Sequence, residues 1–439
     1  MIKEILLQVD ADETAVAVLE DERLMEIYLE RTGSRRLVGN IYKGQVANVL
    51  PGMQAAFVDI GLEKNAFLYV DDTSGIEALE GNTIPRSRRG IIDVVREGQE
   101  IIVQVTKEPE GTKGARVTTQ ITLPGRYLVL MPTVNYVGIS RRIEDEAERE
   151  RLKAIARKAK PRRMGLIIRT VAAGIDAAEL SQEVKVLCQT WRRIRQRARR
   201  KSAPCLIHHD IELTLRILRD LYNEDTDRLL VNSREVYARV LEVLEGKMSD
   251  LRQRVILKEG EDLFSLYGVQ NQMDQALKNK VWLKRGGYLI IDHMEALTAI
   301  DVNTGKYVGR NNLADTVLTT NLEAAAEVAR QLRLRNIGGI IIVDFIDMDD
   351  PSHREQVLKI LEQELSRDKT KTQVLGFTRL GLLEMTRKKA RQGLENMLQK
   401  ECPYCQGKGK VLSEETVALK ARKEVVQRAF NSKARALLI

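Results

Sequence analysis

Apolar runs of strand length alternate with helix-forming segments between residues 277 and 400. A helix is expected over Asn312–Leu334, a second helix is opened by Asp350 and Pro351, and a basic helix is expected over Leu382–Leu398. The strand runs around them are YLIIDHM, ALTAIDVN, IIIVDFID and TQVLGF. Strands that alternate with helices fold into layers in which the helices cover a sheet. This part of the chain therefore predicts an α/β layered domain.

Two of these apolar strands lead into an aspartate. Asp301 follows Ala299 and Ile300, and Asp344 follows four β-branched residues. A carboxylate at the end of a buried strand needs a partner, and two neighbouring carboxylates repel each other. Mg²⁺ removes that conflict, because it binds one or two carboxylates, keeps several waters and takes substrate phosphate for the rest. Asn303, on the same strand face as Asp301, can orient that aspartate or donate to the phosphate.

An ordinary structural role for these aspartates stays open at this point. The pattern at Asp301 and Asp344 fits catalysis and capping of the strand ends equally well. For Asp347, Asp349 and Asp350 we expect turn and N-cap roles. The residues alone therefore leave the role of the two strand-end aspartates undecided.

The rest of the chain contains further folding units, because 439 residues exceed the size at which a single core stops growing. Residues 1–36 alternate apolar and polar side chains, which predicts antiparallel strands. Residues 37–123 hold about five short strands with glycine turns and a long polar loop at 71–98, a pattern that fits an OB-fold barrel. Residues 124–209 mix strands and helices, and residues 210–276 are mostly helical with a strand near REVYARV.

Basic residues exceed acidic ones by 71 to 62, which gives a net charge of +9 and indicates a polyanionic partner. Two basic stretches stand out, Arg192–Lys201 at the end of a predicted helix and the run Arg387, Lys388, Lys389 and Arg391. Such stretches are usually solvated faces. The N-terminus has no charged leader with an apolar block, and the apolar runs are too short to span a membrane, so we expect a cytoplasmic protein.

The four cysteines are too few for a disulfide framework, but two of them form a CxxC motif. Cys402-Pro403-Tyr404-Cys405 has the shape of a zinc knuckle. Zn²⁺ needs four ligands, so two chains that share one ion through a Cys₄ site are the economical solution. A redox dithiol is the alternative, although no thioredoxin-like pattern surrounds the motif. Cys188 and Cys205 are expected to be buried and inert.

Several long motifs occur in an order that resembles the ribonuclease E/G family. They are GNIYKGQVANVLPGMQAAFVDIG, KNAFLYV, LVLMP, GISRRIE, GLIIRTVAAG, AIDVNTG, GGIIIVDFIDM, GLLEMTRKKAR and CPYCQGKG. The resemblance implies a Mg²⁺-dependent endoribonuclease that cleaves single-stranded RNA to 5′-phosphate and 3′-hydroxyl ends, in ribosomal RNA processing and messenger RNA decay. It implies that Asp301 and Asp344 bind Mg²⁺ with the assistance of Asn303, and that Cys402 and Cys405 hold a Zn²⁺ shared between two protomers.

The resemblance also implies RNA contacts outside the catalytic site. Arg169 and Thr170 match a pocket that prefers a 5′-monophosphate end, where an arginine fork and a hydroxyl can bind a small dianion. Without the resemblance we would interpret Arg169 as part of a surface salt bridge. Phe57 and Phe67 are expected to stack on bases, although their pattern alone favours the barrel core, and Lys113 is expected to contact the RNA backbone. The two basic stretches would then neutralise phosphates.

The family's architecture maps onto this chain as several subdomains. An RNase H-like subdomain is expected at 1–36 plus 210–276, an OB-fold RNA-binding domain at 37–123, a 5′-sensor region at 124–209, a DNase I-like catalytic layer at 277–400, a zinc link at 401–410 and a C-terminal helix at 411–439. About thirty residues follow the link, fewer than the tetramer-forming domain of larger relatives, so we expect a homodimer. Loop 71–98 looks longer than in those relatives and is open to RNA contact or disorder. The competing interpretations are a non-catalytic RNA-binding or assembly protein and a DNA nuclease.

Overall fold

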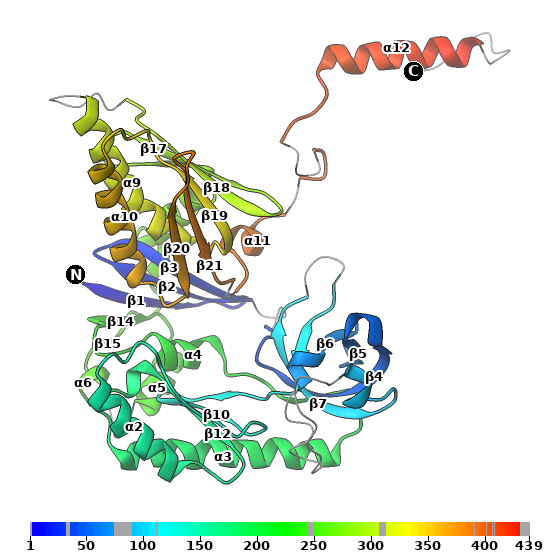
Figure 1. Ribbon diagram of the computed structural model, residues 1–439, viewed down its shortest axis with the longest axis vertical. Helices are drawn as coiled ribbons and strands as arrows, with labels where there is room; N and C mark the ends of the chain where they lie inside the picture. Colours follow the sequence, from blue (N-terminus) through cyan, green and yellow to red (C-terminus); the bar gives the residue numbers. More distant parts are fainter. Residues whose placement is uncertain are drawn as a thin grey trace. The chain divides into compact units, whose positions relative to one another are not determined.

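The computed structural model describes residues 2–31, 36–73, 90–109, 113–244, 249–306, 313–389, 391–400, 402–405, 407 and 409–430. The chain divides into two compact units, each described here by itself. Unit 1 comprises Met1–Arg23 and Tyr28–Val269, and unit 2 comprises Leu24–Ile27 and Gln270–Ile439. The described residues form a mixed α/β protein with four sheets, one of them closed into a barrel (Figure 1). Within these ranges, no helix combines the length and the apolar character needed to cross a membrane.

A five-stranded sheet with the order β15-β14-β1-β2-β3 contains the N-terminus. Its strands are β1 (Lys3–Val9), β2 (Glu13–Glu20), β3 (Arg23–Arg31), β14 (Arg228–Val231) and β15 (Val255–Leu257). The predicted antiparallel pairing is confirmed for β1 and β2, and β14 adds to β1 in parallel. The accompanying helices are α4 (Leu213–Asp220), α5 (Arg234–Val243), α6 (Ser249–Arg252), α7 (Leu263–Leu266) and α8 (Val269–Ala276).

The strand predicted near REVYARV is wrong, because that segment is helix α5. The Ser233 side chain caps the helix by accepting a hydrogen bond from the backbone N–H of Val236. Val240 and Leu244, one helical turn apart, are buried in the core of this sheet. Spacing of three to four residues therefore outweighs the strand preference of the valines.

A closed barrel is built from five strands, as predicted for residues 37–123. They are β4 (Ile41–Leu50), β5 (Ala55–Asp59), β6 (Ala66–Tyr69), β7 (Glu100–Lys107) and β8 (Arg116–Thr118), and β13 (Cys205–His208) adds to the outside of β4. Pairing of β4 with β7 closes the barrel. Residues 74–89 of the predicted loop lie outside the described residues. Its described end is not simply a polar loop, since Ile91 and Val95 are buried in the barrel core.

A four-stranded sheet with the order β11-β12-β10-β9 carries two helices. The strands are β9 (Leu123–Pro124), β10 (Leu128–Met131), β11 (Val137–Ile139) and β12 (Gly165–Ile168), and the helices are α2 (Glu146–Ala159) and α3 (Ala177–Arg200). The basic stretch at the end of α3 is a solvated face, as predicted, because Trp191, Ile194 and Ala198 pack inward and leave the arginines exposed. Cys188 and Cys205 are only half-buried, which corrects the expectation of full burial. Burial still raises the pKa of the Cys188 thiol.

Unit 2 is built on a six-stranded sheet with the order β16-β17-β18-β19-β21-β20. Its strands are β16 (Lys280–Trp282), β17 (Tyr288–His293), β18 (Leu297–Asn303), β19 (Gly339–Asp344), β20 (Thr372–Phe377) and β21 (Leu383–Arg387). Its helices are α9 (Leu313–Leu334), α10 (Pro351–Ser366), α11 (Leu394–Leu398) and α12 (Glu414–Phe430). Helices α9 and α10 pack against one face of the sheet and share its apolar core (Figure 1). The predicted layered domain and the C-terminal helix are confirmed.

The basic helix predicted over Leu382–Leu398 is wrong in its first half, which is strand β21. Leu383 and Met385 alternate into the core, which is the two-residue period of a strand. Arg387, the next residue on that face, is buried beside Asp368 and is therefore not part of a solvated basic face. Helix formation begins only at Leu394.

Candidate functional site

Asp301 and Asp344 lie next to each other at the ends of two parallel strands. Strand β18 pairs with β19 so that Asp301 is directly opposite Asp344. The preceding pair, Ile300 and Val343, is buried in the core. Because side chains alternate between the faces of a sheet, both aspartates point to the face opposite the helices, about 5 Å apart along the sheet. Both carboxylates are exposed.

Asn303 holds the carboxylate of Asp301 in place. Its side-chain amide donates a hydrogen bond of 2.8 Å to Oδ2 of Asp301. The two residues are separated by one residue of β18, so both side chains point to the same open face. Of the two contacts expected for Asn303, the structure contains the one that orients Asp301.

The electrostatics of this pair are unfavourable for two charged carboxylates. Partial burial raises the pKa of Asp344, and the negative charges of Asp301 and Asp347 raise it further. Among the described residues, no basic side chain forms an ion pair with Asp301 or Asp344. Asp347 was expected to be an ordinary turn residue, yet its charge acts directly on Asp344. Within the described ranges, the site is therefore a concentration of carboxylate oxygens that forms no ion pair with a basic side chain.

The later aspartates of the DFIDMDD segment have different surroundings. The side chain of Asp350 accepts a hydrogen bond of 2.8 Å from the backbone N–H of Ser352 and caps α10, which confirms the predicted N-cap. That hydrogen bond lowers the pKa of Asp350. Asp349 is exposed. Asp344 of this segment thus lies on the open face of the sheet, whereas Asp350 caps the start of a helix.

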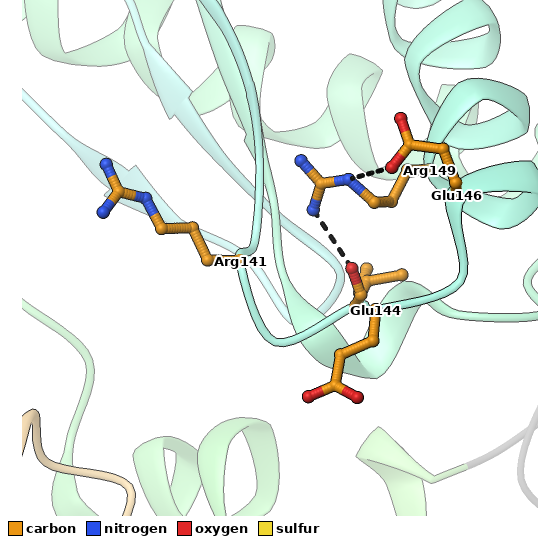
Figure 2. Close-up of a pocket in the computed structure, with 5 residues that line it drawn as sticks. Arg141, Glu144, Glu146 and Arg149 are labelled. Atoms are coloured by element: carbon orange, nitrogen blue, oxygen red, sulfur yellow. Dashed lines mark hydrogen bonds and ion pairs between the residues drawn. The ribbon is translucent and has the colours of Figure 1, made fainter.

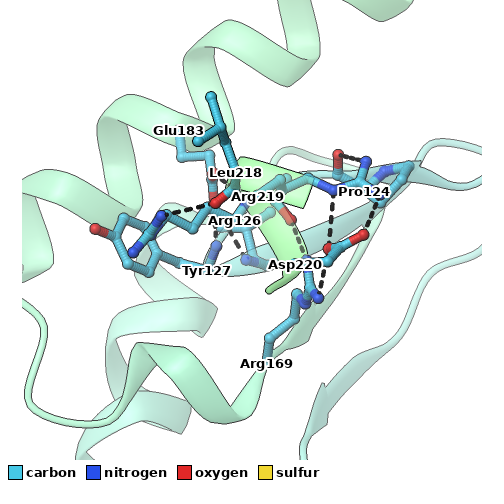
Figure 3. Close-up of polar contacts among 10 residues, drawn as sticks. Pro124, Arg126, Tyr127, Arg169, Glu183, Leu218, Arg219 and Asp220 are labelled. Carbon is cyan, nitrogen blue, oxygen red and sulfur yellow. Dashed lines mark hydrogen bonds and ion pairs between the residues drawn. The ribbon is translucent and has the colours of Figure 1, made fainter. Parts of the chain in front are cut away.

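Arg169, at the end of β12, is held in a polar network (Figure 3). Its Nη1 donates to the carbonyl of Gly125 at 2.7 Å, and its Nη2 lies 2.8 Å from Oδ1 of Asp220. Burial alone would raise the pKa of Asp220, but the guanidinium groups of Arg219 and Arg169 outweigh it and lower that pKa. Arg169 therefore does form the salt bridge that its pattern suggested. It is also fixed in position at the end of the strand.

Thr170 contacts Ser140, whose chain neighbour Arg141 lines a hollow with mostly charged walls. Its hydroxyl is 2.8 Å from the hydroxyl of Ser140, and the backbone carbonyl of Ser140 accepts a hydrogen bond of 3.1 Å from Arg149. The hollow is lined by Arg141, Ile143, Glu144, Glu146 and Arg149 (Figure 2). These arginines were not among the predicted site residues. The double arginine after Ser140 in GISRRIE was the available signal.

Phe57 and Phe67 are neighbours on the barrel surface. They are paired across β5 and β6, and their rings meet edge to face at 5.5 Å. Both side chains are half-buried and lie outside the barrel's buried core, so the core alternative does not hold for them. Tyr69 extends the row at 4.3 Å from Phe67, and Arg116 stacks on Tyr69 at 4.7 Å. The two-residue spacing from Phe67 to Tyr69 could have predicted this extension. Lys113 is exposed.

The two cysteines of the CxxC motif lie close together between α11 and α12. Cys402 is exposed and Cys405 is half-buried, and neither forms a disulfide. Backbone N–H groups of Cys405 and Tyr404 lower the pKa of the Cys402 thiol, which favours the thiolate that a metal ion requires. Within the described ranges, no group of three or more His, Cys, Asp or Glu side chains is arranged to hold a metal ion. One chain thus offers two of the four ligands that Zn²⁺ needs.

Comparison with known proteins identifies the family to which this chain belongs. Residues 122–390 match the model of the Ribonuclease E/G family. The chain is 47% identical to Ribonuclease G of Escherichia coli (strain K12) over 430 residues, covering 97% of this chain and 88% of that protein. It is 46% identical to Ribonuclease G of Haemophilus influenzae over 427 residues, covering 97% and 87%. Ribonuclease E of Nostoc sp. is 41% identical over 398 residues, which are 90% of this chain and 57% of that protein. The chain therefore belongs to the ribonuclease E/G family and is a homologue of these endoribonucleases.

Proposed function

We propose that this protein is a Mg²⁺-dependent endoribonuclease that cleaves single-stranded RNA and leaves 5′-phosphate and 3′-hydroxyl ends. The observation that carries the proposal is the pair Asp301 and Asp344, held side by side on an open sheet face with no ion pair to a basic side chain in the part of the chain that the structure describes. Hard oxygen ligands of this kind suit Mg²⁺. Partial burial and the charges of Asp301 and Asp347 raise the pKa of Asp344, and a divalent cation held by the two carboxylates would relieve that repulsion. The donor set therefore fits the metal.

Each residue of the site has a separate task in this proposal. Asp301 and Asp344 hold the Mg²⁺, and the amide of Asn303 fixes the rotamer of Asp301 through its hydrogen bond. When bound, the ion supplies an activated water and compensates the charge that develops on the phosphate. Asp347 adds negative charge beside Asp344, which strengthens the attraction for a cation.

A second part of the proposal is a preference for RNA with a 5′-monophosphate, bound by Arg169 and Thr170. Among the described residues, Gly125 and Asp220 engage two of the five N–H donors of the Arg169 guanidinium, which leaves the others to bind a phosphate. The Thr170 hydroxyl supplies a further donor. A ready measurement is the cleavage rate on 5′-monophosphate against 5′-triphosphate RNA, with the preference expected to vanish in Arg169→Ala.

The barrel is the proposed binding surface for the RNA strand. Phe57 and Phe67 offer half-exposed rings on which bases can stack, and Lys113 offers a charge for the backbone. The exposed arginines at the end of α3 add a salt-dependent contribution. We propose the family's subdomains for this chain, with an RNase H-like part at 1–36 plus 210–276, the OB-fold at 37–123, a 5′ sensor at 124–209 and a DNase I-like layer at 277–400.

Cys402 and Cys405 are the proposed ligands of a Zn²⁺ shared with the same cysteines of a second chain. The low pKa of the Cys402 thiol suits this role, and two chains together complete a Cys₄ site. The protein would then act as a homodimer in the cytoplasm, in ribosomal RNA processing and messenger RNA decay. A Cys402→Ser, Cys405→Ser variant should lose zinc and halve its mass in solution. Retention of both would overturn the link.

The catalytic proposal is tested by cleavage of an unstructured single-stranded RNA oligonucleotide. The wild-type protein should cut it with Mg²⁺ and stop when EDTA is added. Asp301→Asn should abolish cleavage while RNA binding persists, and Asp349→Asn, a matched exposed aspartate nearby, should cut at the wild-type rate. Wild-type protein that binds the RNA and never cuts it would instead support a non-catalytic RNA-binding role. Cleavage of DNA in place of RNA would support a DNA nuclease.

A further inference from the structure

The open face of the unit 2 sheet carries an exposed tryptophan and a half-buried tyrosine in the row next to that of the acidic pair. Trp282 on β16 lies opposite Tyr288 on β17, which in turn lies opposite Asn303 on β18. The neighbouring row of the same face contains Lys280, Ile290, Asp301 and Asp344. These rows run across the strands, so the aromatic residues and the acidic pair share one surface.

Burial of the alternate residues confirms which face this is. Val281, Leu289 and Val302 form the row between the two, and all three are buried in the core on the helix side. Their neighbours along each strand must therefore point the other way. Trp282 is 58% exposed there, an unusual position for the largest apolar side chain. Adjacent strands are about 5 Å apart, so Trp282 is about 10 Å from Asn303 along the sheet.

Lys280 adds a positive charge to the aromatic pair. Its ammonium group lies 3.6 Å from the ring centre of Tyr288 and 4.2 Å from that of Trp282. The two rings meet edge to face at 5.4 Å. In the part of the chain that is described, no carboxylate forms an ion pair with Lys280. The cation is thus held by the rings and is available to a phosphate.

We propose that Lys280, Trp282 and Tyr288 form a nucleobase platform that binds the RNA strand next to Asp301 and Asp344. A base stacks on the exposed ring of Trp282, and the ammonium of Lys280 contacts the phosphate beside it. Stacking on the platform aligns the backbone with the acidic pair on the same face. The inference rests on the proposed function, because it makes the platform a positioning site for the strand that is cut.

Single-stranded RNA fits this surface better than a protein partner does. A ring with an unpaired lysine matches a base with its phosphate, whereas a protein interface core is usually depleted of lysine. The negative pair in the adjacent row repels phosphate unless a cation is bound, so Lys280 and the rings supply the attraction nearest to the site. Stacking also tolerates any base, which suits a strand-positioning role.

Intrinsic fluorescence gives a readout of the platform that does not depend on cleavage. The chain has two tryptophans, and the other one, Trp191, is 3% exposed. Titration of the full-length protein with oligoadenylate in EDTA should quench the emission of Trp282 by base stacking. In Trp282→Phe the quenching should disappear while binding persists, because the phenyl ring still stacks.

Affinity for the same fluorescently labelled oligoadenylate supplies the second readout. Trp282→Ala should bind about tenfold more weakly. Met294→Ala, which removes a side chain of similar exposure (56%) beyond the other end of β17, should bind like the wild type. Unchanged Trp282 emission in the presence of RNA, or wild-type affinity in Trp282→Ala, overturns the platform. Emission that changes with protein concentration instead of RNA also overturns it and points to a protein interface.

The cleavage assay separates this proposal from the catalytic one. If Trp282 is quenched by RNA but the wild-type protein never cuts RNA, the catalytic proposal fails and the binding platform remains. If the wild type cuts RNA but Trp282 does not respond to it, the platform fails and the catalytic proposal remains.

Discussion

Two aspartates of unit 2 illustrate opposite ways to keep a carboxylate at the edge of a protein core. Asp368 is 4% exposed and accepts a hydrogen bond of 2.7 Å from Nε of the equally buried Arg387. The same guanidinium also donates to the backbone carbonyl of Ile337 and to Thr370. Asp344 is exposed, faces Asp301 and has a raised pKa, with no basic partner among the described residues.

The difference indicates what each aspartate is for. A buried charge must be paired within the protein, and its pair is worth most to the folded state when every donor is used. A carboxylate pair that remains unneutralised on an open face reduces stability, which makes sense when a bound ion supplies the missing charge. The contrast therefore places Arg387 and Asp368 in the structural framework and supports the proposal that Asp301 and Asp344 bind the catalytic ion.

The largest effect is expected for Asp344→Asn. Loss of a metal ligand removes several kcal/mol of transition-state stabilisation, which lowers the cleavage rate by about a thousandfold or more. The free energy of unfolding should stay the same or rise slightly, because one of two repelling charges is gone. Initial rates on single-stranded RNA and urea unfolding measure the two quantities. If the variant lost stability and kept its activity, Asp344 would be a structural residue like Asp368, and the comparison would be wrong.

Arg387→Ala should have the largest effect on stability. It leaves the Asp368 carboxylate buried without its partner, which costs about 3–5 kcal/mol of unfolding free energy. The matched control is the double variant Arg387→Met, Asp368→Leu, which removes both charges and should recover most of that loss. Urea unfolding of the three proteins decides the matter. Equal losses in the single and double variants would mean that packing, and not the unpaired charge, is responsible.

Asp350→Ala tests whether Asp350 acts only as a helix cap or belongs to the acidic site that includes Asp344, six residues earlier in the sequence. Loss of the hydrogen bond to the backbone N–H of Ser352 should lower the free energy of unfolding by about 1 kcal/mol. The cleavage rate of the folded protein should not change. A large loss of cleavage would show that the acidic site extends to Asp350, against the division made here.

The smallest effect is expected for Glu148, and it is measured through the pH dependence of the free energy of unfolding. Hydrogen bonds from Arg151 and from the backbone N–H of Gly174 lower its pKa from 4.5 to about 2. A lowered pKa stabilises the folded state above pH 4.5, and that contribution is lost as the pH falls toward about 2. Glu148→Gln should therefore flatten the acid side of the stability profile, and only weakly, since solvent screens this pair. An unchanged profile would show that the pair adds nothing.

Local patterns predicted much of the fold because they report which face of each element is buried. The barrel and the layered sheet of unit 2 both follow from apolar periodicity. Arg387 was misplaced because its partner Asp368 is nineteen residues away, and only the paired strands bring the two together. A run of basic residues has the same sequence pattern whether its first arginine is buried or exposed to solvent.

The candidate site could likewise be predicted only where a local sequence pattern marks its residues. Asp301 and Asp344 each follow an apolar strand run, which marks them as candidates, and the two-residue spacing puts Asn303 on the same face as Asp301. The contact of Arg169 with Asp220 and the alignment of Trp282 with Asn303 depend on pairings between distant segments. Such features require the register of several strands or helices, which no local pattern contains.

The measurement that tests the central claim most directly is Mg²⁺ binding by the RNA-free protein. A ligand that binds only the folded state stabilises it, by about 2.7 kcal/mol at a hundred times its Kd. Mg²⁺ should raise the unfolding temperature of the wild type and of Asp349→Asn, and it should leave Asp301→Asn and Asp344→Asn unchanged. An equal rise in all four proteins would place the ion elsewhere and contradict the assignment of this carboxylate pair.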